Sequence, residues 1–523
     1  MLKRFSENSY LNTLIVAGAA IFTFFPTVEN FFYLDEWGNL YEWTHGYPYV
    51  SAIFTVNIFR FLFDTFYLNS TGYFVAALTV YTASVVIFYL FVARLLNNKV
   101  LGLVAGLLYA TSPIGITTTT MVWTYVAEGG YPLTVMLLML LYLFWRYFTE
   151  KKKIYLIAGF FAFMLFNELE PRRAFMFFPI LVLFDYMFNH VKKILSLGFI
   201  ARTVALFALF VSYYKYDVSL TKIFATGKII FSEAASTFDW HTKLILGRDS
   251  LTDPRPLITL TNILLAGPWI FISERLAGYV DLADINEIRF LVITTLVVVL
   301  SLIVVAWKVK REWGQILLFS LGWVHINVLG IYIFSSPGVS EAVHRTLSLA
   351  APGYALFVTV SGAALYTFLT RRTKIADPTL KRIFIFAFLL ILTGNFLATR
   401  SNFEKFNAFH SRPARAFFSD LKRYYPTLPE NPLIYIDTPN DARTKYVLSR
   451  IYGGNNYGAS ATMAVFYPGR TKEDVVVARD LVTVEKFTGT DKAKIDRVFA
   501  FYFDSNGLRD TTSDIRKELQ NKK

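Results

Sequence analysis

An aspartate and a glutamate lie side by side directly after the first long apolar segment, in Tyr33-Leu34-Asp35-Glu36-Trp37. Aromatic residues surround the pair, which is typical of the layer where a membrane meets water. A carboxylate in such a half-dry layer has a perturbed environment and is a candidate for a functional role. We expect Asp35, with Glu36 in reserve, to act as a general base. The plainer interpretation is two charges of a solvated loop.

A group of cations lies near the ends of later apolar segments, on what we expect to be the same face of the membrane as the acid pair. The planar fork of arginine fits a phosphate, and a phosphate at a membrane surface suggests a lipid head group. For Arg172 and Arg173, the alternative is an ion-pair cluster with the neighbouring glutamates. For His344 and Arg345, it is a solvated turn. The group comprises Arg172, Arg173, His344 and Arg345.

A carboxylate opposite a phosphate site suits transfer of a group from a lipid phosphate to a hydroxyl. The attacking hydroxyl must lose a proton, which a carboxylate can accept. The leaving phosphate is a weak base, so it needs cations rather than a general acid. The residues that we expect near the substrate or acceptor are Trp37, Trp123, Glu128, Glu168 and Glu170.

The composition is that of a polytopic membrane protein. Of 523 residues, 54% are hydrophobic and only 17% are charged, below the roughly 25% of soluble domains. Largely apolar runs recur through the first 400 positions, long enough to cross a hydrocarbon core of about 30 Å. We expect eleven spans, at approximately residues 11–28, 73–93, 100–122, 131–149, 154–167, 173–189, 195–213, 288–307, 314–334, 346–369 and 381–398.

The charges of the loops predict the orientation of these spans. Loops on the side of the N-terminus are basic, for example Lys151-Lys152-Lys153, which indicates a cytoplasmic face. The other face receives a first outer loop at 29–72, a long outer loop at 214–287, and the acid pair and cations described above. Within the first loop, Val50–Tyr67 has the apolar spacing of a helix lying in the interface.

The chain changes character at about residue 400 and becomes polar. Leu433–Asp437 and Val498–Phe503 have the pattern of strands, and Asp441–Ile451 has that of a helix. We therefore expect residues 1–399 to form a membrane domain and residues 400–523 a small α/β domain of roughly 120 residues. With an odd number of spans, this second domain lies outside the cytoplasm while the N-terminus lies within it.

The charge and ligand patterns limit the partners. The net charge of +14 is spread over short loops, so it indicates membrane orientation and no nucleic-acid partner. Cysteine is absent, and the histidines form no pair at ligand spacing. Asp35, Glu36 and Glu128 could supply oxygen ligands to a divalent cation. We expect no obligatory metal or other cofactor.

Four short motifs resemble the GT-C glycosyltransferases that use lipid-phosphate sugars, near the protein O-mannosyltransferase branch. Tyr33–Trp37 is similar to their acidic first-loop motif, and Thr111-Ser112-Pro113 through to Leu137 to their third span, loop and fourth span. Phe166–Arg173, which leads into Phe178-Pro179-Ile180-Leu181, resembles their fifth-to-sixth hairpin. His344–Gly353 is similar to their late-span motif. The resemblance covers about residues 10–400, with the motifs in the expected order.

This resemblance implies a GT-C-like bundle that moves a sugar from a polyprenyl phosphate to an acceptor hydroxyl on a protein, lipid or glycan, with inversion. It implies Asp35 as the base, with Arg172, Arg173 and Arg345 near the donor phosphate. Two features depart from the family pattern. Thr346 stands where tyrosine is usual, and the hairpin has two arginines and two glutamates instead of one lysine and one glutamate.

Two other functions fit the same sequence. A non-catalytic carrier or flippase would recognise lipid phosphates at the same basic sites, and its activity would survive loss of both acids. An assembly scaffold would bind partners through the region beyond residue 400. Charged residues are scarce at the middle of the predicted spans, which favours the enzyme over the carrier.

Overall fold

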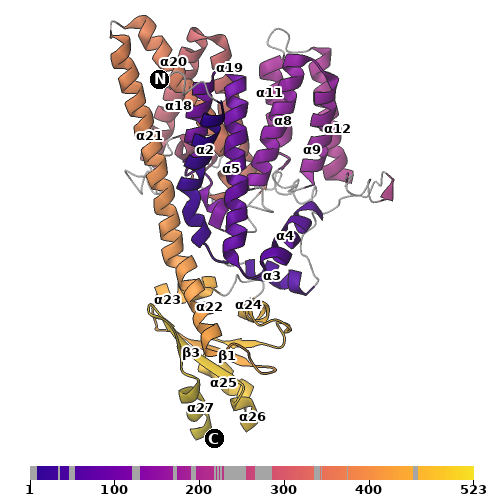
Figure 1. Ribbon diagram of the computed structural model, residues 1–523, viewed down its shortest axis with the longest axis vertical. Helices are drawn as coiled ribbons and strands as arrows, with labels where there is room; N and C mark the ends of the chain where they lie inside the picture. The colour runs from indigo at the N-terminus through magenta and orange to yellow at the C-terminus, as the bar shows by residue number, and fades with distance from the viewer. Residues whose placement is uncertain are drawn as a thin grey trace.

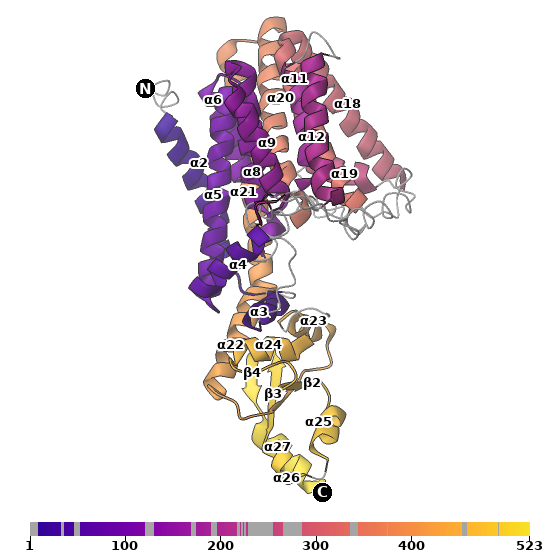
Figure 2. The same cartoon turned by 90° about the vertical axis from the view of Figure 1, so that its right-hand side faces the viewer.

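The computed structural model describes residues 9–32, 36–45, 53–120, 130–168, 174–189, 196–216, 220, 223, 226–228, 255–264, 285–334, 342, 344–373, 375–451, 458–489 and 491–522. These residues are mostly helical, and the helices form an elongated bundle with a small sheet at one end (Figures 1 and 2). Among the described residues, six helical segments are long and apolar enough to cross a membrane. They are Ser9–Glu29, Ser70–Leu95, Tyr131–Glu150, Val292–Val309, Arg345–Arg372 and Asp377–Tyr424.

Each predicted span overlaps at least one of the described helices. The helices of the bundle are α2 (Ser9–Phe24), α5 (Ser70–Leu95), α6 (Lys99–Ala110), α8 (Tyr131–Glu150), α9 (Lys153–Asn167), α11 (Phe177–Asn189), α12 (Leu197–Tyr216), α18 (Ile285–Val309), α19 (Arg311–Phe334), α20 (Ala351–Arg372) and α21 (Asp377–Phe406). Four of them, α6, α9, α11 and α12, are apolar but shorter than the six above. The first loop adds α3 (Glu36–Thr44) and α4 (Ile53–Phe66), and the long loop adds α15 (Arg255–Leu264). The predicted helix at 50–67 is therefore confirmed as α4, which runs obliquely to the bundle (Figure 1).

The prediction of one span over 100–122 is wrong. Helix α6 ends at Ala110, and the chain continues through Pro113 and Gly115 into the 3₁₀-helix η2 (Ile116–Thr120). Proline has no N–H for a helix interior, and Gly115 has a φ of +69°, which a helix does not allow. The predicted span at 346–369 lies within the candidate span Arg345–Arg372, which begins with the 3₁₀-helix η3 (Arg345–Ala350) and continues directly into α20.

The last bundle helix does not end where its apolar residues end. Helix α21 continues into the π-helical turn η4 (Asn407–Ser411) and then into α22 (Arg412–Tyr424), so one helical segment of 48 residues runs from the bundle into the sheet region (Figure 1). At about 1.5 Å per residue it is about 70 Å long. Pro413 explains the π turn, because its ring clashes with the carbonyl four residues earlier in a regular α-helix.

The C-terminal region forms a four-stranded mixed sheet in the order β2-β1-β3-β4. Strand β1 (Leu433–Asp437) pairs in parallel with β2 (Val476–Ala478) and β3 (Val498–Asp504), with Leu433 opposite both Val476 and Val498. Strand β4 (Gly507–Asp510) pairs antiparallel with β3. The predicted strands and the predicted helix, observed as α23 (Ala442–Ile451), are confirmed. The remaining helices are α24 (Gly458–Phe466), α25 (Leu481–Thr488), α26 (Lys492–Ile495) and α27 (Thr512–Asn521).

Alternate residues of the strands pack on opposite sides of the sheet. Leu433 and Val498 belong to a small core beneath α25, α26 and α27. Ile434 and Phe501 belong to the large core that also contains the bundle helices and α22. Because side chains alternate along a strand, each strand contributes residues to the cores on both sides of the sheet. The buried core is therefore continuous from the bundle into one face of the sheet, across the predicted boundary at residue 400.

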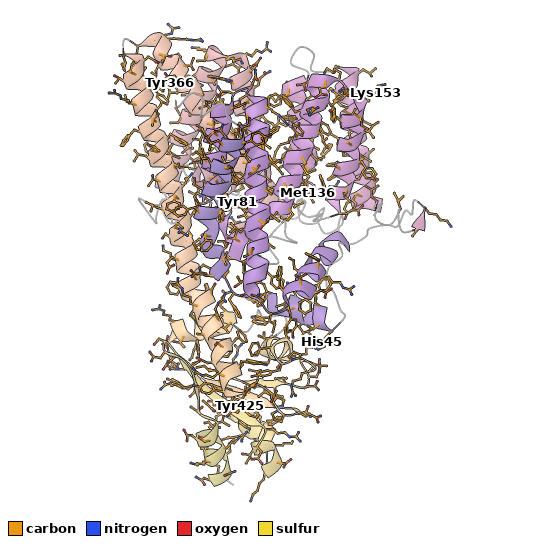
Figure 3. All side chains as sticks on the ribbon, in the orientation of Figure 1. His45, Tyr81, Met136, Lys153, Tyr366 and Tyr425 are labelled. Atoms are coloured by element: carbon orange, nitrogen blue, oxygen red, sulfur yellow. The ribbon has the colours of Figure 1, made fainter. Side chains whose placement is uncertain are left out.

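The two termini lie at opposite ends of the long axis (Figures 1 and 2). Lys153 and Tyr366 lie near the end of the N-terminus, while His45 and Tyr425 lie towards the sheet (Figure 3). Helix α3 lies between the bundle and the sheet. Helix α3 of the first loop therefore packs against the C-terminal region, on α24.

Candidate functional site

The structure describes five of the predicted site residues. They are Glu36, Trp37, Glu168, His344 and Arg345. The other six, Asp35, Trp123, Glu128, Glu170, Arg172 and Arg173, lie outside the described residues, so their proposed roles stay predictions. Described segments flank these six residues in the sequence, and their contacts define the surroundings of the site.

Glu36 is the first residue of α3 and is 1% exposed. A carboxylate is stabilised at a helix N-terminus, where the backbone N–H groups and the helix dipole favour negative charge. Trp37 is also buried, and its ring lies 5.3 Å from that of Phe32 and 4.7 Å from that of Phe418 on α22. The aromatic residues around the acid pair thus pack partly inside the protein, against the C-terminal region. They do not form only a layer at the membrane surface, as the sequence predicted.

The first loop is hydrogen-bonded to the segment after α6. Asn30 is fully buried, and its Nδ2 donates to the backbone oxygen of Thr119 in η2 over 2.8 Å. A buried amide without such a partner would cost roughly 1–3 kcal/mol. This hydrogen bond joins the first loop, three residues before the Tyr33–Trp37 motif, to the motif that begins at Thr111.

The segment after α6 also contacts the late-span motif. Thr118 Oγ1 donates to the backbone oxygen of Arg345 over 2.8 Å, and the Gly115 N–H donates to the oxygen of Ala342 over 2.9 Å. A Cβ on Gly115 would lie 2.3 Å from the backbone nitrogen of Ser348, so only glycine permits this approach. Two of the four motifs, those that begin at Thr111 and at His344, are therefore in direct contact. The first loop joins them through Asn30, just before the Tyr33–Trp37 motif.

His344 has a structural role in this arrangement. Its Nδ1 accepts from the Thr346 N–H over 3.3 Å and lies 2.8 Å from Thr346 Oγ1, so it caps η3. Thr346 stands where the resembled family has tyrosine, and here its hydroxyl contacts the histidine. The cap fixes the start of η3, from which Arg345 extends.

Glu168 in the fifth-to-sixth hairpin is likewise buried, at 5% exposed. It follows the end of α9 and accepts a hydrogen bond from the backbone N–H of Leu220. This contact joins the hairpin to the long outer loop. The role of Glu168 in acceptor binding stays a prediction, while its contact with Leu220 is structural.

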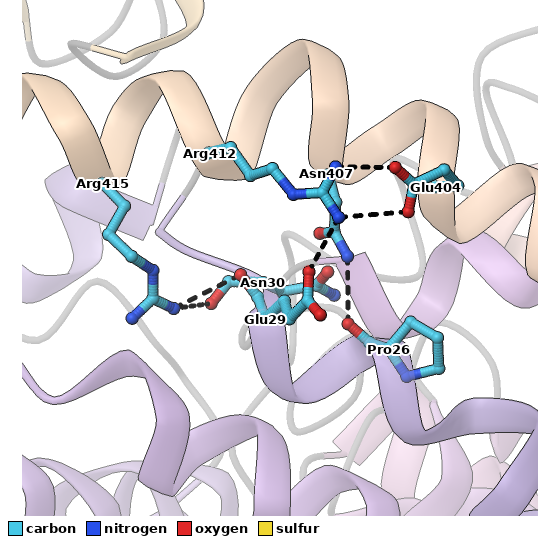
Figure 4. Close-up of polar contacts among 7 residues, drawn as sticks. All are labelled: Pro26, Glu29, Asn30, Glu404, Asn407, Arg412 and Arg415. Carbon is cyan, nitrogen blue, oxygen red and sulfur yellow. Dashed lines mark hydrogen bonds and ion pairs between the residues drawn. The ribbon is translucent and has the colours of Figure 1, made fainter.

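The C-terminal region contacts the first loop just before the acid pair (Figure 4). Arg415 on α22 donates to the backbone oxygens of Glu29 and Asn30 over 3.3 and 3.2 Å, and its guanidinium lies over the ring of Phe31. Arg412 pairs with the carboxylate of Glu29 over 3.1 Å and with that of Glu404 over 2.6 Å.

A third contact comes from the π turn itself. Asn407 is buried, and its Nδ2 donates to the oxygen of Pro26 over 3.0 Å (Figure 4). The π turn and the first turns of α22 therefore contact residues 26–31. Exposed ion pairs are worth at most about 1 kcal/mol, so the hydrogen bonds to the main chain contribute more to the geometry.

A second set of contacts lies just after the acid pair. His45, at the end of α3, contacts the backbone oxygen of Arg470 through Nε2 over 2.8 Å. Tyr41 accepts the N–H of Lys472 at its hydroxyl over 3.0 Å. Helix α3 also packs on α24. The C-terminal region thus contacts the first loop on both sides of Asp35 and Glu36.

The sequence did not predict these contacts. Arg412, Arg415 and Asn407 were not candidates, because an isolated arginine or asparagine in a polar region has no local signal of its partner. No group of three or more potential metal ligands occurs among the described residues.

No family model matches the chain, and a comparison with curated proteins found no relative. The fold defines a helical membrane protein whose C-terminal sheet region packs against its first loop. The buried acid of that loop and the junction of η2 with η3 define the candidate site.

Proposed function

We propose that the protein is an integral membrane glycosyltransferase of the GT-C type, with eleven spans, a cytoplasmic N-terminus and an extracytoplasmic C-terminal region. It transfers a sugar from a polyprenyl phosphate to an acceptor hydroxyl, with inversion. The observation that supports this is the meeting of the first loop with η2, and of η2 with η3, through hydrogen bonds at one end of the bundle. The 3₁₀-helices η2 and η3 belong to two of the four segments that resemble the family, and the first-loop contact comes from Asn30, just before a third.

In this reaction the acceptor hydroxyl attacks the anomeric carbon of the donor and gives its proton to Asp35. A new C–O bond forms on one face of the sugar while the bond to the phosphate oxygen breaks on the other. The lipid phosphate leaves with the electron pair, and Arg172, Arg173 and Arg345 stabilise its charge. Glu36, buried at the start of α3, orients the loop and is the reserve base.

The remaining predicted residues contact the acceptor or shape its site. Trp123, Glu128 and Glu170 fall in segments that directly adjoin η2 and α9. The chemistry needs no obligatory metal, although Asp35, Glu36 and Glu128 have the oxygen ligands that a divalent cation prefers.

The test is Asp35→Asn in membranes, assayed with a radiolabelled polyprenyl-phosphate sugar. We expect transfer to fall at least a hundred-fold, the usual contribution of a general base. Asp64→Asn is the matched control, because Asp64 is an exposed first-loop carboxylate paired with Arg60 on α4. Full activity of Asp35→Asn at normal expression would overturn the assignment of the base.

The same membranes distinguish an enzyme from a carrier. A lipid carrier would still translocate the polyprenyl phosphate after loss of both Asp35 and Glu36. Translocation in that double variant, together with no sugar transfer by the unmodified protein, would replace the enzyme with the carrier.

A further inference from the structure

A cavity of about 360 Å³ lies where η2, the end of α21, the π turn η4 and α23 meet. This is within the size range of small-ligand sites, roughly 300–1,000 Å³. π-Helical turns occur frequently at functional sites. None of the five predicted site residues that the structure describes is among the residues that line the cavity.

Its rings are placed to stack on a ligand. Phe406, Phe409 and Tyr446 line it, and Phe409 and Tyr446 remain 43% and 50% exposed. Large aromatic side chains usually bury their surface, so two exposed rings beside one cavity indicate a surface that a ligand covers. The flat, weakly polar faces of a sugar ring fit such rings.

The cavity is also cationic. Lys405 lines it, the Arg443 guanidinium lies 5.1 Å from the centre of the Phe409 ring, and that of Arg450 lies 4.8 Å from the centre of the Tyr446 ring. No aspartate or glutamate is among the described residues that line it. The polar residues Thr117, Thr120, Asn402 and His410 also line the cavity, together with the apolar Ile116 and Phe403. This combination suits a ligand with hydroxyl groups and a negative charge.

The surroundings favour a water-soluble ligand over a lipid head group. Helix α23, which supplies Tyr446, begins after Asp441 and exposes Arg443 and Lys445. The charged residues of α23 are all basic, and together with the exposed Asp441 just before the helix they form a charged surface that faces water. The cavity therefore opens beside the polar C-terminal region, beyond the apolar part of α21.

The cavity is connected to the acid loop through both of its walls. Thr117 and Thr120 flank Thr119, whose oxygen accepts from Asn30. Asn407, next to Phe406, donates to Pro26. We propose that this cavity binds an acidic saccharide, which is the acceptor if the proposed function holds. The acceptor is then a glycan with a carboxylate or phosphate, and not a protein side chain.

The experiment measures binding to the full-length protein in detergent by isothermal titration calorimetry. The probes are a glucosyl–glucuronic acid disaccharide, its neutral counterpart cellobiose, and inorganic phosphate. We expect the acidic disaccharide to bind best. Phe409→Ala and Tyr446→Ala should each weaken it at least ten-fold, and Lys405→Gln should weaken the acidic disaccharide more than cellobiose.

Tyr502→Ala is the matched control, because Tyr502 also has a guanidinium, that of Arg509, 5.0 Å from its ring centre but lies outside the cavity. Tyr446→Phe keeps the ring and should keep most of the binding, which separates stacking from a folding defect. Equal affinities in all variants, or no binding of either disaccharide, would overturn the inference. Displacement by short-chain phosphatidylglycerol would assign the cavity to a lipid head group instead.

The binding result is independent of the transfer assay. If the disaccharide binds but the protein transfers no sugar, the inference stands and the proposed function fails. If the protein transfers sugar to a protein acceptor, and the Phe409 and Tyr446 variants remain active, the function stands and the inference fails.

Discussion

At the scale of single residues, backbone contacts at the η2–η3 junction leave little room for substitution. Gly115 combines a positive φ with a very close approach to the backbone of Ser348. An L-residue in the left-handed region costs roughly 1–2 kcal/mol, and a clash with backbone cannot be relieved by rotating a side chain. This residue therefore determines how closely two of the motifs approach.

We expect Gly115→Ala to lower stability by about 2 kcal/mol or more and to reduce sugar transfer. The measurement is the midpoint of thermal unfolding in detergent, with transfer assayed on the same preparation. Gly362→Ala on α20 is the control, because nothing lies within 4 Å of the Cβ that it adds. Equal midpoints for the two variants would contradict the role assigned to Gly115.

The sequence predicted only part of this detail. Pro113 and Gly115 both disfavour a helix. The apolar residues on either side of them nevertheless predict a single span over 100–122. Whether an apolar run is one helix or a helix followed by a packed 3₁₀ turn depends on tertiary partners, here Arg345 and Ala342. Such partners lie more than 200 positions away and leave no local pattern.

At the scale of elements, α22 connects the sheet region to the acid loop. Arg415 contacts three groups of the first-loop region, the oxygens of Glu29 and Asn30 and the hydroxyl of Ser70 at 3.3 Å. We infer that it is a positioning residue for the loop that carries Asp35. Its effect is indirect, because it acts through the main chain of residues 29–30.

We expect Arg415→Met, which keeps the aliphatic stem, to lower kcat for transfer about five-fold, corresponding to about 1 kcal/mol of lost hydrogen bonding. The KM for the lipid donor should change little. Arg423→Met on the same helix is the control, because Arg423 contacts Asp420 and Tyr424 and not the first loop. A change in KM alone, or equal effects of both variants, would contradict a positioning role.

The loop after α24 contacts the other end of the acid loop, and its structure depends on an ionised carboxylate. Asp474 accepts from the backbone N–H and hydroxyl of Thr471, both over 2.8 Å. These hydrogen bonds, the backbone one first, hold the pKa of Asp474 below its usual value near 3.8, and Arg470 and His45 lower it further. Because the folded pKa is the lower one, the stabilisation is present above pH 4 and is lost as the pH falls through the folded pKa.

We therefore expect Asp474→Asn to be less stable than the unmodified protein at pH 7, and the difference to disappear as the pH falls below the lowered pKa of Asp474. The measurement is the free energy of unfolding as a function of pH. Asp514→Asn on α27, an exposed aspartate, is the control and should show little dependence. A stability difference that persists at the lowest pH would show that the effect is not due to ionisation.

The sequence predicted the apolar helices of the bundle and two of the four strands of the sheet, because their apolar residues have regular periods. It did not predict that α21 and α22 are one continuous segment, since the apolar run ends near residue 398 while the helix continues with a polar face. The sequence predicted two strands, Leu433–Asp437 and Val498–Phe503. It did not predict that they pair with each other in parallel. Pairing order depends on which helices cover each face.

At the scale of the whole molecule, the termini lie at opposite ends of the long axis (Figure 1). The longest helical segment, Asp377–Tyr424, runs from the bundle into the sheet region. This arrangement agrees with the basic loops near the N-terminal end, which indicate the cytoplasmic face. The proposed orientation places the sheet region and the first loop on the opposite side of the membrane. The absence of cysteine makes this accessible to direct test.

We expect a cysteine at Lys152, between α8 and α9, to be labelled by a membrane-impermeant maleimide only after the cells are permeabilised. A cysteine at Ser513 on α27 should be labelled in intact cells, or in spheroplasts if an outer envelope blocks the reagent. Both residues are exposed, so burial does not limit either reaction. Arg372→Cys at the end of α20 should behave as Lys152→Cys does, because an odd number of spans separates each of them from the sheet. Labelling of Lys152→Cys and Ser513→Cys from the same side would require an even number of spans between them, and would put the acid loop on the wrong face for a donor in the outer leaflet.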